Sequence, residues 1–153
     1  MVYLKFSLLF FVIHFICYMA AGVIDLQFAG KLYAGKERLY RHMMRDLDDK
    51  KESTRIARLL IPSQLIRALL MSVVLYPILP FLTGLSFGMQ FLFMSSLMLV
   101  YADFSSAVPF SNTIEGWVYL KKEYVQKNAF WTILLESIMY SLLFGLLSAW
   151  ILI

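Results

Sequence analysis

The chain has 153 residues, of which 61% are hydrophobic and 16% charged, and its mean hydropathy is +0.73. A soluble globular domain is about half apolar and about one quarter charged, so this composition argues strongly against a water-soluble fold. One cysteine, Cys17, excludes an internal disulfide, and two histidines with one cysteine form no recognisable zinc or haem motif. We therefore expect an all-α integral membrane protein without a metal or cofactor.

Four apolar segments are each long enough to cross a bilayer as a helix, which takes about 20 residues. They run over residues 2–30, 59–82, 87–108 and 128–153. The short, uncharged linker between spans two and three predicts an antiparallel helical hairpin. Pro77 and Pro80 are expected to end the second span, and Pro109 the third. Residues 1–153 are thus predicted to form one membrane domain, a four-transmembrane-helix bundle.

The distribution of Lys and Arg predicts the orientation. Nine of these cations lie in loop 31–58 and three lie between spans three and four, whereas the opposite side carries Lys5 alone. By the positive-inside rule, loops 31–58 and 109–127 are cytoplasmic and both termini are extracytoplasmic, in a cell (inner) membrane. The competing interpretation is a signal peptide cleaved near Ala20-Ala21-Gly22, but cleavage there would export the nine-cation loop.

Loop 31–58 is both basic and amphipathic. Its apolar residues recur at three-, four- and seven-residue spacings, as on one helix face: Leu32, Tyr33, Leu39, Tyr40, Met43, Met44 and Leu47. We expect an interfacial amphipathic helix with its apolar face on the bilayer and its cations near anionic lipid headgroups. The alternative is a plain cytoplasmic extension of span one. Five interleaved anions and the lack of a base-stacking motif argue against nucleic-acid binding.

Each span carries one charged side chain toward its cytoplasmic end: Asp25, Arg67, Asp103 and Glu136. A charge at mid-helix costs about 2.5–3.5 kcal/mol to insert, so each one needs a partner or a role. At 1.5 Å per residue, all four lie about 9–13 Å from the cytoplasmic boundary. We predict a buried charge layer in which Arg67 pairs with Glu136. Asp25 and Asp103 are then free to titrate or to line a polar vestibule.

One guanidinium offsets only one or two of three carboxylates in a low dielectric, so a carboxyl must be protonated or another cation must enter. The alternative places Asp25 and Asp103 at helix ends in water, with Arg67 extending to the interface. His14 lies about 25 Å from Lys31 along span one. We therefore expect His14 to be a hydrogen-bonded packing residue remote from the charge layer.

Span four also carries a small-residue ridge that we define as Ser137, Ser141, Gly145 and Ala149. Small residues at every fourth position let another helix backbone approach closely. The ridge therefore predicts a helix-packing face. The partner helix could belong to the same chain or to an oligomer.

A family resemblance extends over residues 67–119. It is carried by Arg67, Leu75-Tyr76-Pro77, Pro109, Asn112-Thr113-Ile114-Glu115-Gly116 and Tyr119. These motifs resemble an uncharacterised family of small bacterial four-span membrane proteins of unknown function. The resemblance implies the four-span topology, brings no activity, and marks Arg67, Glu115 and Gly116. We expect Glu115 in the loop near the charge layer, or as an anionic residue favouring the start of a short helix.

The function favoured by the sequence is a non-enzymatic subunit, adaptor or assembly factor of a membrane complex, with other membrane helices or a second copy as partner. Four spans are few for a standalone carrier, and no inverted repeat with broken helices is evident. A small oligomeric proton- or cation-linked transporter or channel that uses the intramembrane carboxylates is the alternative. An intramembrane lipid-modifying enzyme is the second alternative, although no nucleophile–base spacing, P-loop or metal motif accompanies the carboxylates.

Overall fold

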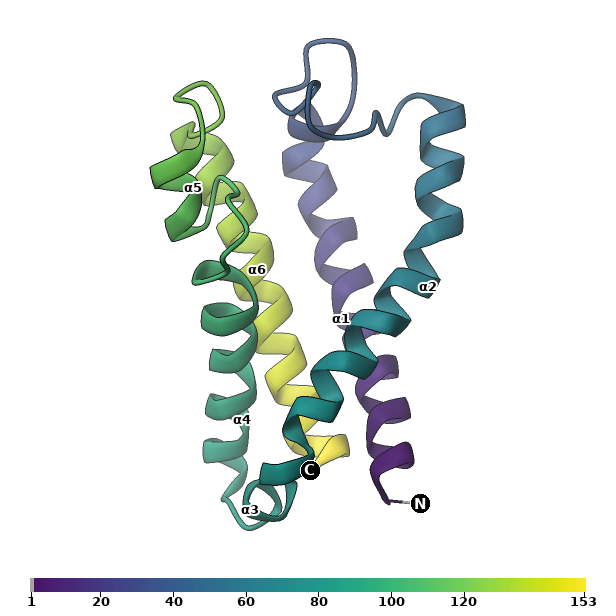
Figure 1. The fold of residues 1–153 in the computed structure, drawn as a ribbon, viewed down its shortest axis with the longest axis vertical. Helices are drawn as coiled ribbons and strands as arrows, with labels where there is room; N and C mark the ends of the chain where they lie inside the picture. The colour runs from purple at the N-terminus through teal and green to yellow at the C-terminus, as the bar shows by residue number, and fades with distance from the viewer. Residues whose placement is uncertain (1) are drawn as a thin grey trace.

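The computed structural model describes residues 2–153 and contains helices but no strands in that range (Figure 1). In chain order the elements are α1 (Val2–Tyr33), α2 (Lys50–Leu75), the 3-10 helix η1 (Tyr76–Ile78), α3 (Leu79–Thr83), α4 (Phe87–Ser96), the π-helix η2 (Leu97–Phe104), α5 (Ile114–Tyr119), α6 (Lys127–Leu147) and the π-helix η3 (Ser148–Leu152). Four helical segments are long and apolar enough to cross a membrane: Val2–Tyr33, Lys50–Thr83, Phe87–Phe104 and Lys127–Leu152. The prediction of an all-helical chain with four such segments is confirmed.

The second segment begins earlier than the hydropathy pattern indicates, at Lys50 instead of residue 59. Its first turn is capped by the Asp49 carboxylate, which accepts a hydrogen bond of 2.8 Å from the backbone N–H of Glu52. Pro62 lies inside α2, where proline lacks the N–H that a helix requires. Figure 1 shows α2 bending partway along its length, as an internal proline favours.

The prolines expected to end spans two and three have different effects. Pro77 and Pro80 lie in the first turns of η1 and α3, so α2 ends at Leu75 but the chain stays helical to Thr83. Proline is tolerated there because the first N–H groups of a helix need no intrahelical acceptor. The third segment ends at Phe104 in the π-helix η2, before Pro109 is reached.

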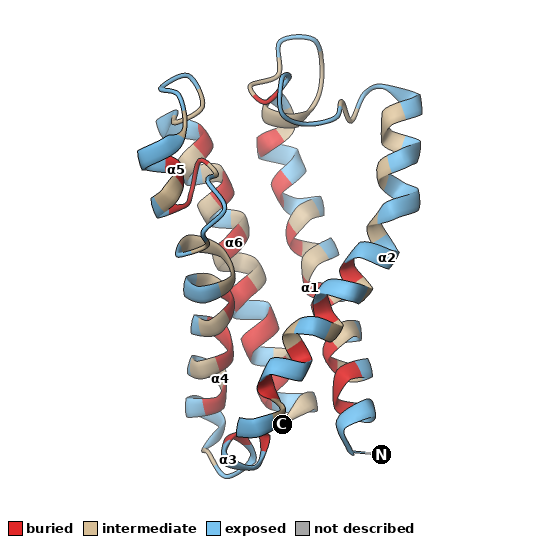
Figure 2. Cartoon of the chain, in the orientation of Figure 1, coloured by how far each residue is buried: buried red, intermediate tan, exposed pale blue. Residues whose placement is uncertain are grey.

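The helices pack in the spatial order α2, α1, α6 and α4, with α6 against both α1 and α4. Both termini and α3 lie at one end of the bundle, and loop 34–49 and α5 lie at the other (Figure 1). We call these the terminal end and the loop end. Buried residues follow the facing sides of the helices, whereas the outer faces are exposed (Figure 2).

The core lies toward the terminal end, where aromatic and sulfur-containing side chains from α1, α4, α6 and η2 interlock. Its fully buried members include Phe10, Phe144 and Met94, and the rings of Phe10 and Phe144 meet edge to face at 5.1 Å. Cys17 is 1% exposed and packs as a small apolar residue. The Ser7 and Ser72 hydroxyls join α1 to α2 through a hydrogen bond of 2.7 Å.

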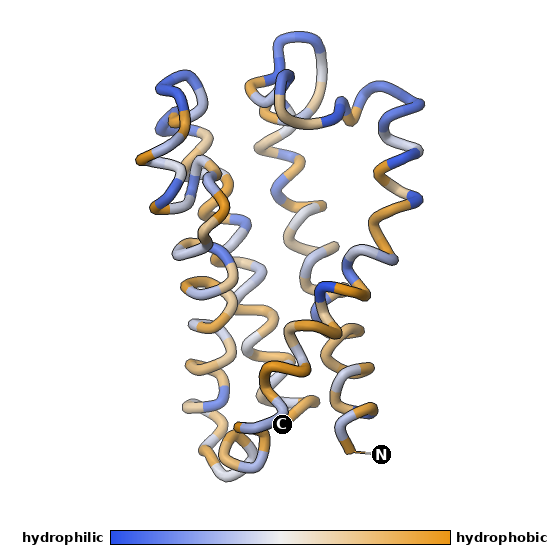
Figure 3. Tube along the Cα trace, viewed as in Figure 1, coloured by the Kyte–Doolittle hydropathy of each residue, from blue (hydrophilic) through white to orange (hydrophobic). Residues whose placement is uncertain are grey.

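The outer surface of the four long segments is apolar. No more than a third of the most hydrophobic window of each segment is buried inside the chain. Hydrophobic residues predominate along the long helices, and hydrophilic residues are concentrated in the loops at the loop end (Figure 3). An apolar surface of this extent is rare on a soluble monomer. The chain is therefore consistent with a multi-pass membrane protein.

The small-residue ridge of α6 and η3 is buried inside the chain, and its contact with α4 is very close. A Cβ atom added to Gly145 would overlap Ser95 Oγ and lie 2.9 Å from the carbonyl oxygen of Phe91. Glycine is thus required at this position because the two helix backbones nearly touch. In this structure the ridge packs against a helix of the same chain.

Residues 34–49 form turns and bends, so the predicted amphipathic helix over 31–58 is not present. Gly35 has a φ of +87°, a conformation that favours glycine and that follows the end of α1. The Arg38 guanidinium donates to the Gly35 carbonyl at 3.0 Å and forms an ion pair of 2.9 Å with Asp46. Backbone N–H groups of Asp48 and Gly35, together with Arg38, hold the pKa of Asp46 below its ordinary value.

Loop 34–49 is anchored to other parts of the protein through Tyr40, whereas Met43 and Met44 are exposed. Tyr40 is fully buried, stacks on Phe110 at 5.1 Å and shares a hydrogen bond of 2.6 Å with the Ser111 hydroxyl. Met44 and Leu47 face a cavity inside the bundle. Loop 34–49 is thus joined to the segment that follows η2.

Candidate ligand-binding cavity

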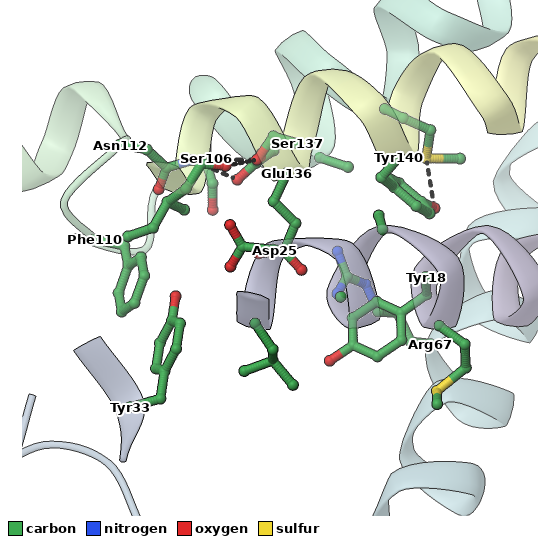
Figure 4. Close-up of a pocket in the computed structure, with 18 of the residues that line it drawn as sticks. Tyr18, Asp25, Tyr33, Arg67, Ser106, Phe110, Asn112, Glu136, Ser137 and Tyr140 are labelled. Atoms are coloured by element: carbon green, nitrogen blue, oxygen red, sulfur yellow. Dashed lines mark hydrogen bonds between the residues drawn. The ribbon is translucent and has the colours of Figure 1, made fainter. Parts of the chain in front are cut away.

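A cavity of about 500 Å³ opens inside the bundle toward the loop end. Its walls come from α1, α2, η2, α6, loop 34–49 and the segment after η2 (Figure 4). All four residues of the predicted charge layer line it: Asp25, Arg67, Asp103 and Glu136. The structure therefore brings one charged side chain from each long segment to a common space.

Asp25 and Glu136 face the cavity from opposite helices. Asp25 on α1 is only 3% exposed, yet its carboxyl forms no hydrogen bond or ion pair with any residue in the range 2–153. The half-buried carboxyl of Glu136 on α6 likewise has no such partner among these residues. The Glu136 carboxyl lies close to Gly22 of α1, since a Cβ placed at Gly22 would be 3.6 Å from Glu136 Oε1, an ordinary van der Waals distance.

The predicted ion pair between Arg67 and Glu136 is not formed. In residues 2–153 the ion pairs within 4.0 Å are Arg38–Asp46 and Arg41–Glu37, both in loop 34–49. Arg67 is carried by α2, which packs mainly on α1, whereas Glu136 is carried by α6 on the other side of α1. Equal depth along two helices, on which the prediction depended, does not fix the direction in which each side chain points.

Asp103 is the carboxylate of the cavity that has a partner in the chain. Asn112, which is 1% exposed, donates through Nδ2 to Asp103 Oδ1 at 3.1 Å and to Ser137 Oγ at 3.4 Å. Asp103 lies near the end of the π-helix η2. π-Helical turns are rare and occur often at functional sites. Asn112 thereby links the end of η2 to α6.

His14, predicted to be a hydrogen-bonded packing residue remote from the charge layer, lines another part of the same cavity. It is fully buried and hydrogen-bonded at both ring nitrogens. Nε2 donates to Gln64 Oε1 at 2.9 Å, so Nδ1 of the neutral ring accepts from the Tyr140 hydroxyl at 2.6 Å. Met98 Sδ lies 3.6 Å from the same hydroxyl. The cavity therefore extends farther along α1 than the depth of the carboxylates indicates.

Aromatic and apolar residues complete the cavity wall and were not predicted as site residues. The aromatic ones are Tyr18, Tyr33, Phe110 and Tyr140, and the methionines are Met19, Met44 and Met98. A usable signal was present in α1, because residues 14, 18, 22 and 25 recur at helical spacing. That stripe combines a histidine, a tyrosine, a glycine and an aspartate on one face.

The three positions marked by the family resemblance have different surroundings. Arg67 lines the cavity, whereas Glu115 lies in the first turn of α5 and does not. Glu115 thus occupies the place where an anionic side chain favours the start of a helix. Gly116 lies against the Phe110 backbone, and a Cβ atom there would overlap the Phe110 carbonyl group.

Within residues 2–153, no three His, Cys, Asp or Glu side chains are grouped so that they could hold a metal ion. The carboxyl groups are instead distributed around the cavity wall. Comparison of the chain with protein-family models, with curated proteins and with solved structures finds no match.

Proposed function

We propose that the chain is a small membrane protein that binds a cation in its cavity, as part of proton- or cation-linked transport or conduction. The observation that carries this proposal is the pair of unpartnered carboxyls, Asp25 and Glu136, that face one cavity between α1 and α6. Intramembrane carboxylates are costly and commonly mark ion or substrate pathways.

The charge balance of the cavity supports a cationic ligand. Three carboxyl groups and a single guanidinium line it. Asp25, Asp103 and Glu136 share this one space, so their like charges repel one another there. Like charges so placed in a low dielectric are relieved either by a proton or by an incoming cation. These carboxyl groups can therefore release a proton when a cation binds, and take up a proton when the cation leaves.

We also propose that the chain lies in a cell (inner) membrane with its loop end in the cytoplasm. The two basic loops share this end, and the two termini share the other (Figure 1). The positive-inside rule then makes both termini extracytoplasmic. In this orientation the exposed cations of loop 34–49 lie near anionic lipid headgroups.

Flux measurements in proteoliposomes test the transport proposal. We expect wild-type protein to dissipate an imposed proton or potassium gradient, and Glu136→Gln and Asp103→Asn to reduce that flux at least about tenfold. Glu115→Gln is the matched control, because this carboxyl lies outside the cavity wall. Flux that is absent from the wild type, or that all three variants retain, would contradict the proposal.

A second candidate is a subunit, adaptor or assembly factor of a membrane complex, and the exposure of α2 favours it. In this chain α2 packs chiefly on α1, and Arg67 remains exposed although it lines the cavity. A helix from a partner subunit could cover this side. Purification in a mild detergent should then recover a stoichiometric companion, whereas a clean monomer would count against this candidate.

A further inference from the structure

We infer that the ligand of the cavity is an organic cation with an apolar body, such as a substituted amine or quaternary ammonium compound, rather than an inorganic ion. This inference rests on the proposed function and specifies its substrate class. It draws on the size of the cavity, on the distribution of its charges and on the chemistry of its walls.

The size of the cavity fits a small organic molecule. Its volume of about 500 Å³ falls inside the range of about 300–1,000 Å³ that is typical of small-molecule sites. An inorganic cation stripped of water needs several oxygen ligands converging on one point. No such convergence of three acidic, histidine or cysteine side chains exists within residues 2–153.

The buried carboxyl of Asp25 provides an anchor for the positive charge. Asp25 is 3% exposed, lines the cavity and has no hydrogen-bond or ion-pair partner in residues 2–153. Because its oxygens are open to the cavity and no residue pairs with them, the carboxyl can pair with a cationic group that enters this space. Glu136 faces the same space from α6. A ligand cation between these two carboxyls would satisfy both.

The walls of the cavity suit the apolar body of such a ligand. Tyr18 and Tyr33 of α1 present rings to the cavity (Figure 4), and aromatic rings attract ammonium groups and pack on apolar ones. Met19, Met44 and Met98 are also part of the wall, with side chains that adapt to ligands of different shape.

Direct binding to the purified full-length chain tests the inference. We would measure binding of radiolabelled phenyltrimethylammonium, with K⁺ and with tert-butylbenzene, the uncharged isostere of the probe, as competitors. We expect saturable binding that neither competitor displaces at equal concentration. Asp25→Asn should weaken the affinity at least about tenfold, because it removes the charge that pairs with the probe. Asp25→Glu should restore part of it, and Glu115→Gln should leave it unchanged.

The two proposals fail in different ways. If K⁺ displaces the probe, or if K⁺ or proton flux occurs without any saturable probe binding, the organic-cation inference is overturned and the proposed function stands. Displacement by tert-butylbenzene, or equal binding by the wild type and Asp25→Asn, would show a merely apolar site and also overturn the inference. If neither flux nor cation binding occurs, the proposed function fails. The competition uses wild-type protein alone, so it remains decisive even if a variant does not fold.

Discussion

The interface between α4 and α6 and the region between α1 and α2 at the loop end are built in opposite ways. In the first, Gly145 and Ser95 bring two helix backbones almost into contact, and the ridge residues there are small and uncharged. In the second, loop 34–49 separates α1 from α2, and the residues along the opening include Tyr18, Asp25 and Arg67. The α4–α6 interface is therefore closely packed, whereas the region between α1 and α2 at the loop end is open.

This difference indicates how a four-span chain can hold its fold and still keep an open space. Close helix contact gives the dispersion contacts that stabilise helices in lipid, where no hydrophobic force acts between them. A cavity lined by charged residues gives few such contacts, and placing its charges inside the membrane costs free energy. We therefore expect substitutions at the α4–α6 interface to lower stability most, and substitution of a charged residue in the cavity to weaken ligand binding without lowering stability.

The largest effect is expected from Gly145→Ala, which tests the closed side of the comparison. The new methyl group would overlap Ser95 Oγ and crowd the Phe91 carbonyl, so the helices must separate over several turns. Overpacking of a close contact costs about 1–3 kcal/mol, and we expect the upper end of that range because backbone atoms, which cannot rotate away, lie in the path of the new methyl group. Denaturant unfolding in detergent micelles measures the loss in the free energy of unfolding.

Gly88→Ala on α4 is the control for this substitution, because nothing lies within 4 Å of a Cβ at that position. It should leave the stability unchanged or slightly higher, since alanine favours a helix by about 0.8–1.0 kcal/mol over glycine. Equal effects of the two substitutions would contradict the close α4–α6 contact.

The next largest effect is expected from Tyr140→Phe, at the inner end of the cavity. Removal of this hydroxyl leaves Nδ1 of the fully buried His14 without its partner, which costs about 1–3 kcal/mol. Thermal unfolding of wild type and variant measures the loss. Tyr101→Phe is the matched control, since Tyr101 is 80% exposed. A Tyr140→Phe variant as stable as the control would show that the hydrogen bond contributes nothing.

Asp25→Asn should have a smaller effect and the opposite sign. Because the Asp25 carboxyl shares the cavity with two other carboxyls and has no ion-pair partner in residues 2–153, its neutral isostere should raise the free energy of unfolding by about 1 kcal/mol. Chemical denaturation without added ligand measures this gain, with Glu115→Gln as control. A loss of stability would instead indicate that the carboxyl is paired, and would remove the contrast between the closed and the open side.

The helical fold could be predicted from sequence because each long apolar run has few acceptable environments. The depth of the four charged residues along their helices could be predicted as well, because it follows from counting residues. Which charged residues pair could not be predicted, because pairing depends on how each helix is rotated and on which helices are neighbours. Arg67 and Glu136 have equal depth but lie on helices that both pack on α1.

Loop 34–49 illustrates a second limit of the sequence. Its apolar spacing resembles that of a surface helix, yet Tyr40 packs against Phe110 and hydrogen-bonds to Ser111, residues 70 or more positions away in the chain. Contacts so distant in sequence leave no periodic signal. The glycine at position 35 was the local sign of a turn, since glycine readily follows the end of a helix with a positive φ.

The smallest expected effect concerns the Arg38–Asp46 ion pair, which holds loop 34–49 over the open side. The folded pKa of Asp46 lies below its ordinary value of 3.8, mainly because the Asp48 N–H donates to it, with Gly35 and Arg38 adding to the effect. This stabilisation is therefore fully present above pH 3.8 and is lost as the pH falls through the lower folded pKa. Hydrogen exchange of the loop amides, corrected for the intrinsic effect of pH, should accelerate in that range.

Asp46→Asn should make this exchange fast at neutral pH and remove its dependence on acid, because the amide cannot pair with Arg38 as an ion. Glu37→Gln is the control, since the Glu37 side chain is 92% exposed and reaches Arg41 only at 3.9 Å. If loop 34–49 exchanged equally in the wild type and both variants, Tyr40 and its stacking partners would hold it without the ion pair. The loop would then resemble the closed side of the bundle, held by packing alone, and the contrast between the two sides would begin only at the cavity wall.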